Sequence, residues 1–338
     1  MTTSTETSAA ARAERGRPSP LVRTSLIFVA IAVAGLFLAD LETIGVDPWA
    51  EFGRMALGAV TPDFTATDRL FDAVVQTLAF ALLGVALSNV IGFGLALAFH
   101  YRVVQVGCAF VRAIHELFWA LIFLQIFGLS PLTGILAIAI PYAGIIAKVY
   151  AEILEEADPA PARAAPFGSG AVSVFLFARL PDAWVHFKHY SMYRLECGLR
   201  SSAVLGFVGL PTLGFHLDSA FKQGHYSEVS ALLILFYIII ATMRRWMHKR
   251  LLPVYLIGAL IVLPSGAAIS TTNIVRFFTE DILPHPIRVA ESIDSAALAG
   301  LWDWSVGLLT TQALPGAFNT VVLTMIALVG AGACALKS

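Results

Sequence analysis

Six ionisable side chains lie within or at the ends of long apolar runs, where a charge is costly unless it is paired or faces a cavity. They are Arg112, His115, Glu116, Arg194, Glu196 and Arg200. Arg112 stands four residues before Glu116, so one helix face could hold the two as a salt bridge. Glu196 and Arg200 have the same spacing, and for both pairs a structural role and a place along a transport pathway are open. If they face a cavity, the guanidinium groups of Arg194 and Arg200 suit an oxyanion, because they offer paired donors.

Other patterns that could carry chemistry are weak or missing, and we expect no catalytic residue, no bound metal and no cofactor. Three cysteines stand far apart in apolar surroundings and are expected to be buried small hydrophobes. They are Cys108, Cys197 and Cys334. His186 and His189 could bind a metal, but no third or fourth ligand is evident, and a place at the membrane interface is the simpler interpretation. The sequence has no Gly-Lys dipeptide and hence no P-loop, so any ATP must be hydrolysed by a partner.

The composition points to a membrane protein. Of the 338 residues, 58% are hydrophobic and 13% are charged, and the mean hydropathy is +0.78, which excludes a soluble globular protein. Lys and Arg (22) nearly balance Asp and Glu (23), so nucleic-acid binding is not expected. A bilayer-spanning helix needs about 20 apolar residues, and the runs of that kind predict an all-α polytopic protein with about eight transmembrane helices. The runs are 25–39, 74–99, 104–127, 132–150, 190–210, 229–243, 251–269 and 317–335.

Residues 1–22 are rich in Ser, Thr, Ala and Arg and precede the first apolar run. No signal-peptide cleavage site follows that run, so we expect a disordered cytoplasmic tail and an uncleaved anchor. With the N-terminus inside, most Lys and Arg residues of the connecting segments fall on the cytoplasmic side, as the positive-inside rule requires. This predicts a multi-pass protein with a cytoplasmic N-terminus.

The order of elements repeats along the chain. The basic run 243–250 closes a block of six spans, after which a span, an aromatic and proline-containing segment and another span return in the order seen at the start. We therefore expect one complete unit at 23–250. Residues 251–338 are expected to be the start of a second copy that stops after its second span.

Small residues within the second apolar run predict a packing surface, with a substrate-lining role as the alternative. Gly84, Ser88 and Gly92 lie at four-residue spacing, which places them on one face of a helix where another backbone can approach closely. Asn89 lies beside them. It could donate a hydrogen bond across that contact or bond within its own helix.

The polar stretch 152–189 between two spans is punctuated by Pro and Gly. A segment of this length between spans is usually there for a purpose. Small residues at its centre lead to Gly168, and the following apolar run ends at Leu180 and Pro181. We expect a small-residue helix, a glycine turn and a second helix closed by Leu-Pro, which together form a compact cytoplasmic knob. The alternative is a plain interhelical connector.

In this stretch the sequence resembles the membrane-spanning permease subunits of bacterial ABC importers, specifically the phosphonate-type permeases. Their cytoplasmic loop has two alanines, a glycine a few residues later, and a Leu-Pro that ends thirteen residues after the glycine. The matching residues are Ala164, Ala165, Gly168, Leu180 and Pro181. The resemblance covers roughly 70–250 and includes the segments 112–123, 193–196, 200–209 and 226–231.

The resemblance implies a type I ABC importer permease fold in the first six spans, in a bacterial cytoplasmic membrane. It implies that the loop is a coupling helix that docks onto a separate ATP-binding cassette subunit, so that the chain itself is not an enzyme. It also implies an extracytoplasmic substrate-binding protein and a second permease half or chain as partners, with phosphonate or a related phosphorus oxyanion as substrate. The candidate pathway residues are Arg112, Glu116, Arg194, Glu196 and Arg200.

Two other functions fit part of the sequence. An ion-coupled secondary transporter of a small anion also uses repeats and broken helices, but it needs no cytoplasmic knob. An intramembrane hydrolase needs a nucleophile and a base, and the segment 168–170 lacks the pattern of a nucleophile elbow.

Overall fold

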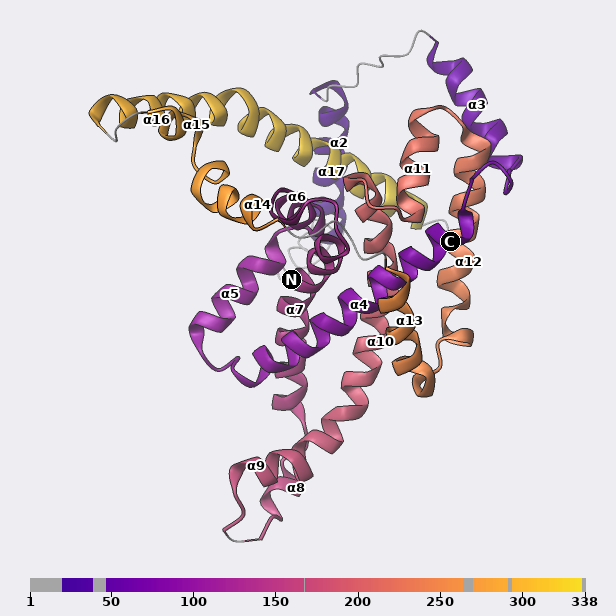
Figure 1. Ribbon diagram of the computed structural model, residues 1–338. Helices are drawn as coiled ribbons and strands as arrows, with labels where there is room; N and C mark the ends of the chain where they lie inside the picture. Colours follow the sequence, from indigo (N-terminus) through magenta and orange to yellow (C-terminus); the bar gives the residue numbers. More distant parts are fainter. Residues whose placement is uncertain (1–19, 39–46, 167, 264–269, 291–293, 336–338) are drawn as a thin grey trace, which may run out of the picture. The chain divides into compact units, whose positions relative to one another are not determined.

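The computed structural model describes residues 20–38, 47–166, 168–263, 270–290 and 294–335 (Figure 1). Throughout these residues the ordered elements are helices, with no strand among them. The helices form two compact units, a larger one at 47–281 and a smaller one that combines 1–46 with 282–338. The all-α polytopic class predicted from composition is confirmed. Most of the predicted tail, 1–19, lies outside the described residues.

The larger unit holds the predicted packing face and the long polar stretch. Its elements are α3 (Pro48–Val60), α4 (Leu70–Leu97), α5 (Arg102–Ala113), α6 (Glu116–Phe127), α7 (Pro131–Glu156), α8 (Ala160–Arg163), α9 (Ala171–Val174), η1 (Phe175–Arg179), α10 (Leu180–Val204), η2 (Leu205–Val208), α11 (Leu213–Lys222), α12 (Tyr226–Trp246), η3 (Lys249–Leu251), α13 (Leu252–Val262), α14 (Thr271–Arg276) and η4 (Phe277–Asp281).

The smaller unit contains the first helix and the last part of the chain. Its elements are α2 (Pro20–Leu38), α15 (His285–Val289), α16 (Ser295–Leu308), η5 (Leu309–Ala313) and α17 (Leu314–Ala335). Helix α17 packs against α2, where a Cβ added to Gly35 would lie 3.1 Å from Val322 Cγ1. A small residue therefore sets this close approach.

The number of spans differs from the eight predicted. Four helical stretches within the described residues are long and apolar enough to cross a bilayer, and two bent pairs raise the number to six. The four are Leu70–Leu97, Pro131–Glu156, Tyr226–Trp246 and Ser295–Gly332. The remaining two predicted runs form shorter apolar helices, Val22–Gly35 and Leu252–Val262. A hydropathy scan does not register where a helix begins and ends: α2 begins at Pro20, before its predicted run, and α13 ends at Val262, within its predicted run.

Helices α4 and α7 form the centre of the larger unit and run in the same direction. Phe80 of α4 would meet a Cβ added to Gly134 of α7, and Gly84 and Gly92 face Ile138 and Ile146, so the contacts keep one parallel register. Each glycine accepts a large side chain of the other helix. Because the two helices are parallel, α5 and α6 must carry the chain back between them.

This contact confirms the predicted packing face on α4. Added Cβ atoms would lie 2.9 Å from Ile138 Cβ at Gly84 and 2.7 Å from Ile146 Cγ2 at Gly92. Ser88 between them is fully buried, and its hydroxyl donates to the Val85 carbonyl within the helix. Lipid offers helices no hydrophobic reason to associate, so such close backbone approach is what holds them together.

A substitution at the contact between α4 and α10 tests the packing. A Cβ at Gly198 would lie 2.5 Å from Val85 Cγ2, with its other neighbours at 3.8 Å. We expect Gly198→Ala to destabilise the fold by about 1–3 kcal/mol, measured as a lower thermal midpoint in detergent. Adding Val85→Ala removes the clashing methyl and should recover most of the loss. Gly94→Ala, which meets nothing within 4 Å, is the control, and equal losses in the single and double variants would contradict the prediction.

Candidate functional site

A group of polar side chains connects three helices of the larger unit, α6, α7 and α10. Glu116 is the first residue of α6, and its Oε1 accepts a hydrogen bond of 2.7 Å from Ser201 Oγ of α10. The same Ser201 hydroxyl lies 2.8 Å from the Tyr142 hydroxyl of α7. Tyr142 and Ser201 are buried, and the Glu116 side chain is only 18% exposed.

Arg194 of α10 lies beside this group. Its guanidinium carbon is 5.4 Å from the ring centre of Tyr142, 5.2 Å from that of Tyr190 and 5.6 Å from that of Tyr193. Its Nε donates to the Tyr190 hydroxyl at 2.9 Å. The π faces of the rings favour a cation, but they leave its charge without a counter-ion. Within the described residues no carboxylate lies within 4.0 Å of the Arg194 guanidinium.

We name Glu116, Tyr142, Arg194 and Ser201 the mid-span cluster. It forms where the predicted span 104–127 is broken, because Ile114 and His115 adopt extended backbone and α5 meets α6 at 93°. His115 caps the new helix by accepting a hydrogen bond from the Leu117 amide at 3.2 Å. Broken helices within a membrane are tolerated where their polar groups find partners or line a cavity.

The two salt bridges predicted along single helices are wrong, the first of them because of this break. Arg112 belongs to α5 and Glu116 to α6, so the two do not share a helix face, and Arg112 is exposed. Glu196 pairs instead with Arg244 of α12, at 3.2 Å. Arg200 is exposed as well. Of the five candidate pathway residues, the structure thus connects Glu116 and Arg194 through Tyr142 and Ser201, and the role of all five remains a prediction.

A second polar group joins α4, α7 and α10 nearer the polar stretch. Asn89 Oδ1 accepts hydrogen bonds from the hydroxyls of Tyr150 and Ser191, the latter at 2.7 Å. Its Nδ2 donates to the Val85 carbonyl of its own helix at 2.7 Å. The bond within its own helix is therefore as predicted, whereas across the contact Asn89 accepts hydrogen bonds instead of donating one.

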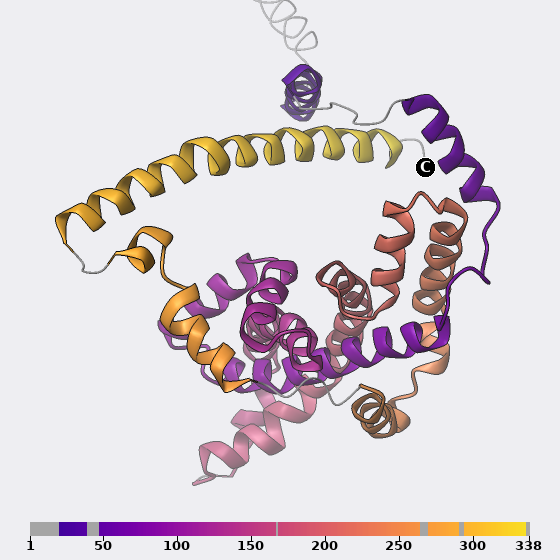
Figure 2. The same ribbon diagram turned by 45° about the horizontal axis from the view of Figure 1, so that its top comes forward.

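The polar stretch folds into a hairpin, 157–180, that projects away from the rest of the larger unit (Figures 1 and 2). It consists of the single turn α8, a turn at Gly168 with φ of +88°, and the helix α9. Beyond the turn, Val172 and Phe177 are 71% and 83% exposed. A projecting element with exposed large apolar side chains favours a protein partner.

The second helix of the hairpin does not close at Leu180 and Pro181, contrary to the prediction. It continues through the π-helical turn η1 into α10, where Leu180 is the first residue and Pro181 the second. Proline fits there because the first turn of a helix leaves its amides unbonded. Ala164 and Gly168 are exposed in the hairpin, and Ala165 is partly buried.

No family model matches the sequence. The phosphite transport system permease protein PtxC of Stutzerimonas stutzeri is 30% identical over 227 residues, which are 63% of this chain and 82% of that protein. The chain belongs to the family of phosphite and phosphonate ABC transport permeases. The resemblance inferred from the hairpin residues and the flanking segments is confirmed.

A second relative and a solved structure are also similar to this chain. The phosphate-import permease protein PhnE of Mycolicibacterium smegmatis is 30% identical over 244 residues, 67% of this permease, and the match spans 45% of that relative's length. A crystal structure of an amino acid ABC transporter aligns with 63% of this permease and 99% of its own chain, at 18% identity and a TM-score of 0.46.

Tyr142 and Ser201 of this permease were missed by the sequence-based search for charged groups. Both are uncharged polar residues within apolar runs, where a tyrosine or serine is common. Only their contacts with Glu116 and Arg194 distinguish them. One sequence feature could have drawn attention to Tyr142: it directly follows Pro141, a proline inside a predicted span.

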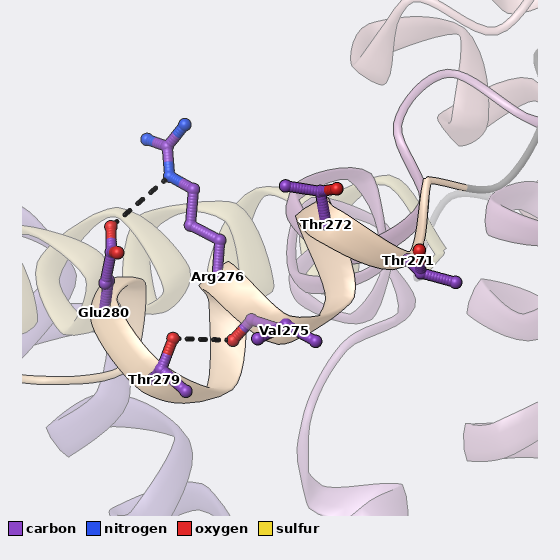
Figure 3. A pocket seen from close by; sticks show the side chains of 6 residues that line it. All are labelled: Thr271, Thr272, Val275, Arg276, Thr279 and Glu280. Atoms are coloured by element: carbon purple, nitrogen blue, oxygen red, sulfur yellow. Dashed lines mark hydrogen bonds and ion pairs between the residues drawn. The ribbon is translucent and has the colours of Figure 1, made fainter.

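Two hollows lie apart from the mid-span cluster. One of about 520 Å³ lies at the base of the hairpin, between the ends of α4 and α7 and η1, and includes His100, Glu155 and Arg179. The other, of about 340 Å³, follows α14 and η4 (Figure 3). Its cation, Arg276, already contacts Glu280 at 3.9 Å and Asp281 at 3.6 Å, so an anion would have to compete with both carboxylates.

The two histidines considered for metal binding, His186 and His189, are exposed on α10. Among the described residues, no group of three His, Cys, Asp or Glu side chains is arranged to hold a metal ion. Cys108 is buried and Cys197 partly buried, both as free thiols, whereas the side chain of Cys334 is not described.

Proposed function

We propose that the protein is the membrane-spanning translocation subunit of an ABC importer for phosphonate, phosphite or a related phosphorus oxyanion. The observation that carries the proposal is the 30% identity to a phosphite permease over 82% of that relative's length. The sequence contains no P-loop, so the energy comes from ATP hydrolysis on a separate subunit. An ion-coupled secondary transporter is not favoured, because the relatives are permease proteins of transport systems and the alternative requires no projecting hairpin.

The hairpin supports an ATP-binding cassette subunit as the partner. In this proposal Ala164, Ala165 and Gly168 lie against the partner, since their small side chains allow close approach. Leu180 and Pro181 join the hairpin to α10, so movement of the hairpin is passed to the helix that carries Arg194. The single turn of α8 has little packing of its own, which suits an element that becomes ordered by docking.

The remaining assignments follow from the same proposal. The protein lies in a bacterial cytoplasmic membrane with its N-terminus inside, receives substrate from an extracytoplasmic binding protein, and works with a second permease half or chain. Residues 23–250 act as the complete permease unit, and 251–338 as the start of a second copy. The mid-span cluster forms part of the pathway, with Arg194 as the group that meets the anion, because its charge has no carboxylate partner among the described residues.

The test is reconstitution of the chain with the ATPase and binding protein that co-purify with it from native membranes. We expect vesicles loaded with ATP to take up labelled phosphite only when the binding protein is added outside. Uptake driven by an ion gradient without ATP would overturn the importer. Purification of the chain without any ATPase, from membranes solubilised in mild detergent, would count against the hairpin as a docking element.

Replacing Gly168 tests the hairpin separately. Because Gly168 has φ of +88° and open space around it, a side chain there strains the backbone without any clash in the core. We expect Gly168→Trp to lower ATPase co-purification and phosphite uptake by about tenfold, which is 1.4 kcal/mol of docking energy. Gly170→Trp, which also has open space but no positive φ, is the control for bulk alone. An unchanged thermal midpoint shows that the fold is intact, and unchanged co-purification would exclude this glycine from the interface.

A further inference from the structure

The hydrogen bonds of the mid-span cluster leave it with acceptors that have no donor of their own. Ser201 has one hydroxyl hydrogen, which it donates to Glu116 Oε1 at 2.7 Å. The bond of 2.8 Å between Ser201 and Tyr142 must therefore receive its hydrogen from the Tyr142 hydroxyl. With this direction fixed, Tyr142 and Glu116 have lone pairs to offer and no hydrogen left to donate.

Arg194, which lies over the Tyr142 ring, supplies the donors of the cluster. The Arg194 guanidinium uses Nε for Tyr190, and its two terminal nitrogens make no hydrogen bond within the described part of the chain. Its carbon lies 5.4 Å from the Tyr142 ring centre, yet no ion pair within 4.0 Å joins Arg194 to Glu116. The cluster thus holds a cation and an anion that are linked through Tyr142 and Ser201, each with unused hydrogen-bonding capacity.

A phosphorus oxyanion with one remaining hydroxyl has the complementary pattern. Its ionised oxygens accept hydrogen bonds from a guanidinium, and its P–OH group donates to a carboxylate. A doubly ionised form has no hydrogen to donate, so its oxygens would face the Glu116 carboxylate with repulsion only. Acceptors placed in this way select the singly ionised form because they repel the doubly ionised one.

We propose that Glu116, held by Ser201 and Tyr142, binds the P–OH proton of the substrate while Arg194 binds its ionised oxygens, so that the permease passes the singly ionised form. The proposal rests on the proposed function, because it assigns the substrate form at the same site. Glu116 and Arg194 contact the substrate. Ser201 and Tyr142 are positioning residues that fix the direction of the hydrogen bonds.

Other charged or titratable groups surround the cluster. Helix α10 carries Tyr190, Tyr193, Cys197, Arg200 and Glu196, the last of which pairs with Arg244. Arg112 lies on α5, and His115 lies where α5 meets α6. Lys148 of α7 is paired with Glu152, and Arg276 of α14, which packs on α6, is paired with Glu280 and Asp281. His115 is the one that most needs a control, because its Nε2 lies 3.9 Å from Glu116 Oε1.

The experiment compares the pH dependence of phosphite uptake in the reconstituted complex of chain, ATPase and binding protein. Phosphorus oxyacids lose their second proton near neutral pH. Above that point, we expect wild-type uptake at limiting phosphite to fall by about tenfold per pH unit, in step with the singly ionised form. The same binding protein serves every variant, so the ratio of variant to wild-type uptake isolates the permease.

Glu116→Gln supplies an amide that can donate to an ionised oxygen, so its ratio to wild type should rise by about tenfold between pH 7 and pH 8. Ser201→Ala keeps the carboxylate but removes its fixed partner, and its ratio should rise in the same direction. It serves as the second variant if Glu116→Gln folds poorly. Tyr150→Phe on α7, in the separate group around Asn89, and His115→Gln should both keep the wild-type profile.

Each outcome decides between the two proposals. If the ratios of variant to wild-type uptake stay constant with pH for both Glu116→Gln and Ser201→Ala, in complexes that still import phosphite, Glu116 does not bind the P–OH proton. The proposed function would then still stand. A rise shared by His115→Gln would assign the pH dependence to that imidazole and would also overturn it. Absence of ATP-driven phosphite uptake in the wild-type complex would instead overturn the proposed function.

Discussion

Gly214→Ala is expected to prevent the larger unit from folding. A Cβ at this position would overlap the carbonyl oxygen of Ala203 and lie 2.6 Å from its carbonyl carbon. Both atoms belong to the backbone and cannot turn aside as a side chain could. We expect a loss of about 3 kcal/mol or more, seen as little monodisperse protein after detergent extraction and a strongly lowered thermal midpoint.

The contact is reciprocal, which explains the size of the effect. A Cβ at Gly206 would overlap the Phe215 amide nitrogen, so η2 and the start of α11 cross with a glycine on each side. The beginning of α11 is also held to α4, where the Leu213 amide donates to Thr77 Oγ1 at 2.9 Å. Gly107→Ala on α5, with nothing within 4 Å, is the matched control. Normal extraction and midpoint for Gly214→Ala would show that this crossing can open without loss of the fold.

The sequence was sufficient to predict features that depend on local pattern. Small residues at four-residue spacing identify the face of α4 that meets α7, because the spacing itself places Gly84 and Gly92 on one side of a helix. The hairpin was predicted from its glycine and prolines, since these residues determine where a chain can turn. Family membership was predicted from the same segment, because its alanines, glycine and Leu-Pro have the spacing typical of the family.

The sequence did not reveal where a helix breaks inside an apolar run. Hydropathy averages over residues and is insensitive to their backbone angles, so 104–127 was predicted to be one span although Ile114 and His115 are extended. The salt bridge predicted between Arg112 and Glu116 assumed a continuous helix, and it is wrong because the two residues lie on separate helices. A dipeptide of ordinary composition, Ile-His, gave no turn signal of the kind that Gly or Pro gives.

The candidate site could be predicted only in part, for a related reason. Arg194 and Glu116 were recognisable because charge in an apolar run is rare. Tyr142 and Ser201 were not, because their importance lies in contacts between helices that are far apart in sequence. Glu196 was assigned the wrong partner, since Arg244 lies on α12, 48 residues away. Side chains that a fold brings together from separate helices leave no spacing pattern in the sequence.

Arg194→Gln is expected to lower ATP-driven phosphite uptake by about 100-fold while the complex still assembles. The substitution removes a charge whose terminal nitrogens have no hydrogen-bond partner in the described residues, and two charge-assisted hydrogen bonds to an anion correspond to about 3 kcal/mol. Arg194→Lys keeps the charge but loses the planar fork, so we expect it to recover only part of the uptake. The measurement is initial uptake into vesicles at limiting phosphite, with the thermal midpoint recorded for each variant.

Lys188→Gln is the matched control, because Lys188 lies on the same helix but is exposed and contacts none of the three tyrosine rings. Its uptake should stay at the wild-type level. If Arg194 served only to pack the tyrosines together, Arg194→Gln would lower the thermal midpoint, and uptake per folded complex would remain near wild type. A loss of uptake at an unchanged midpoint therefore assigns Arg194 to the anion, because stacking on Tyr142, Tyr190 and Tyr193 stabilises the fold whether or not a substrate is present.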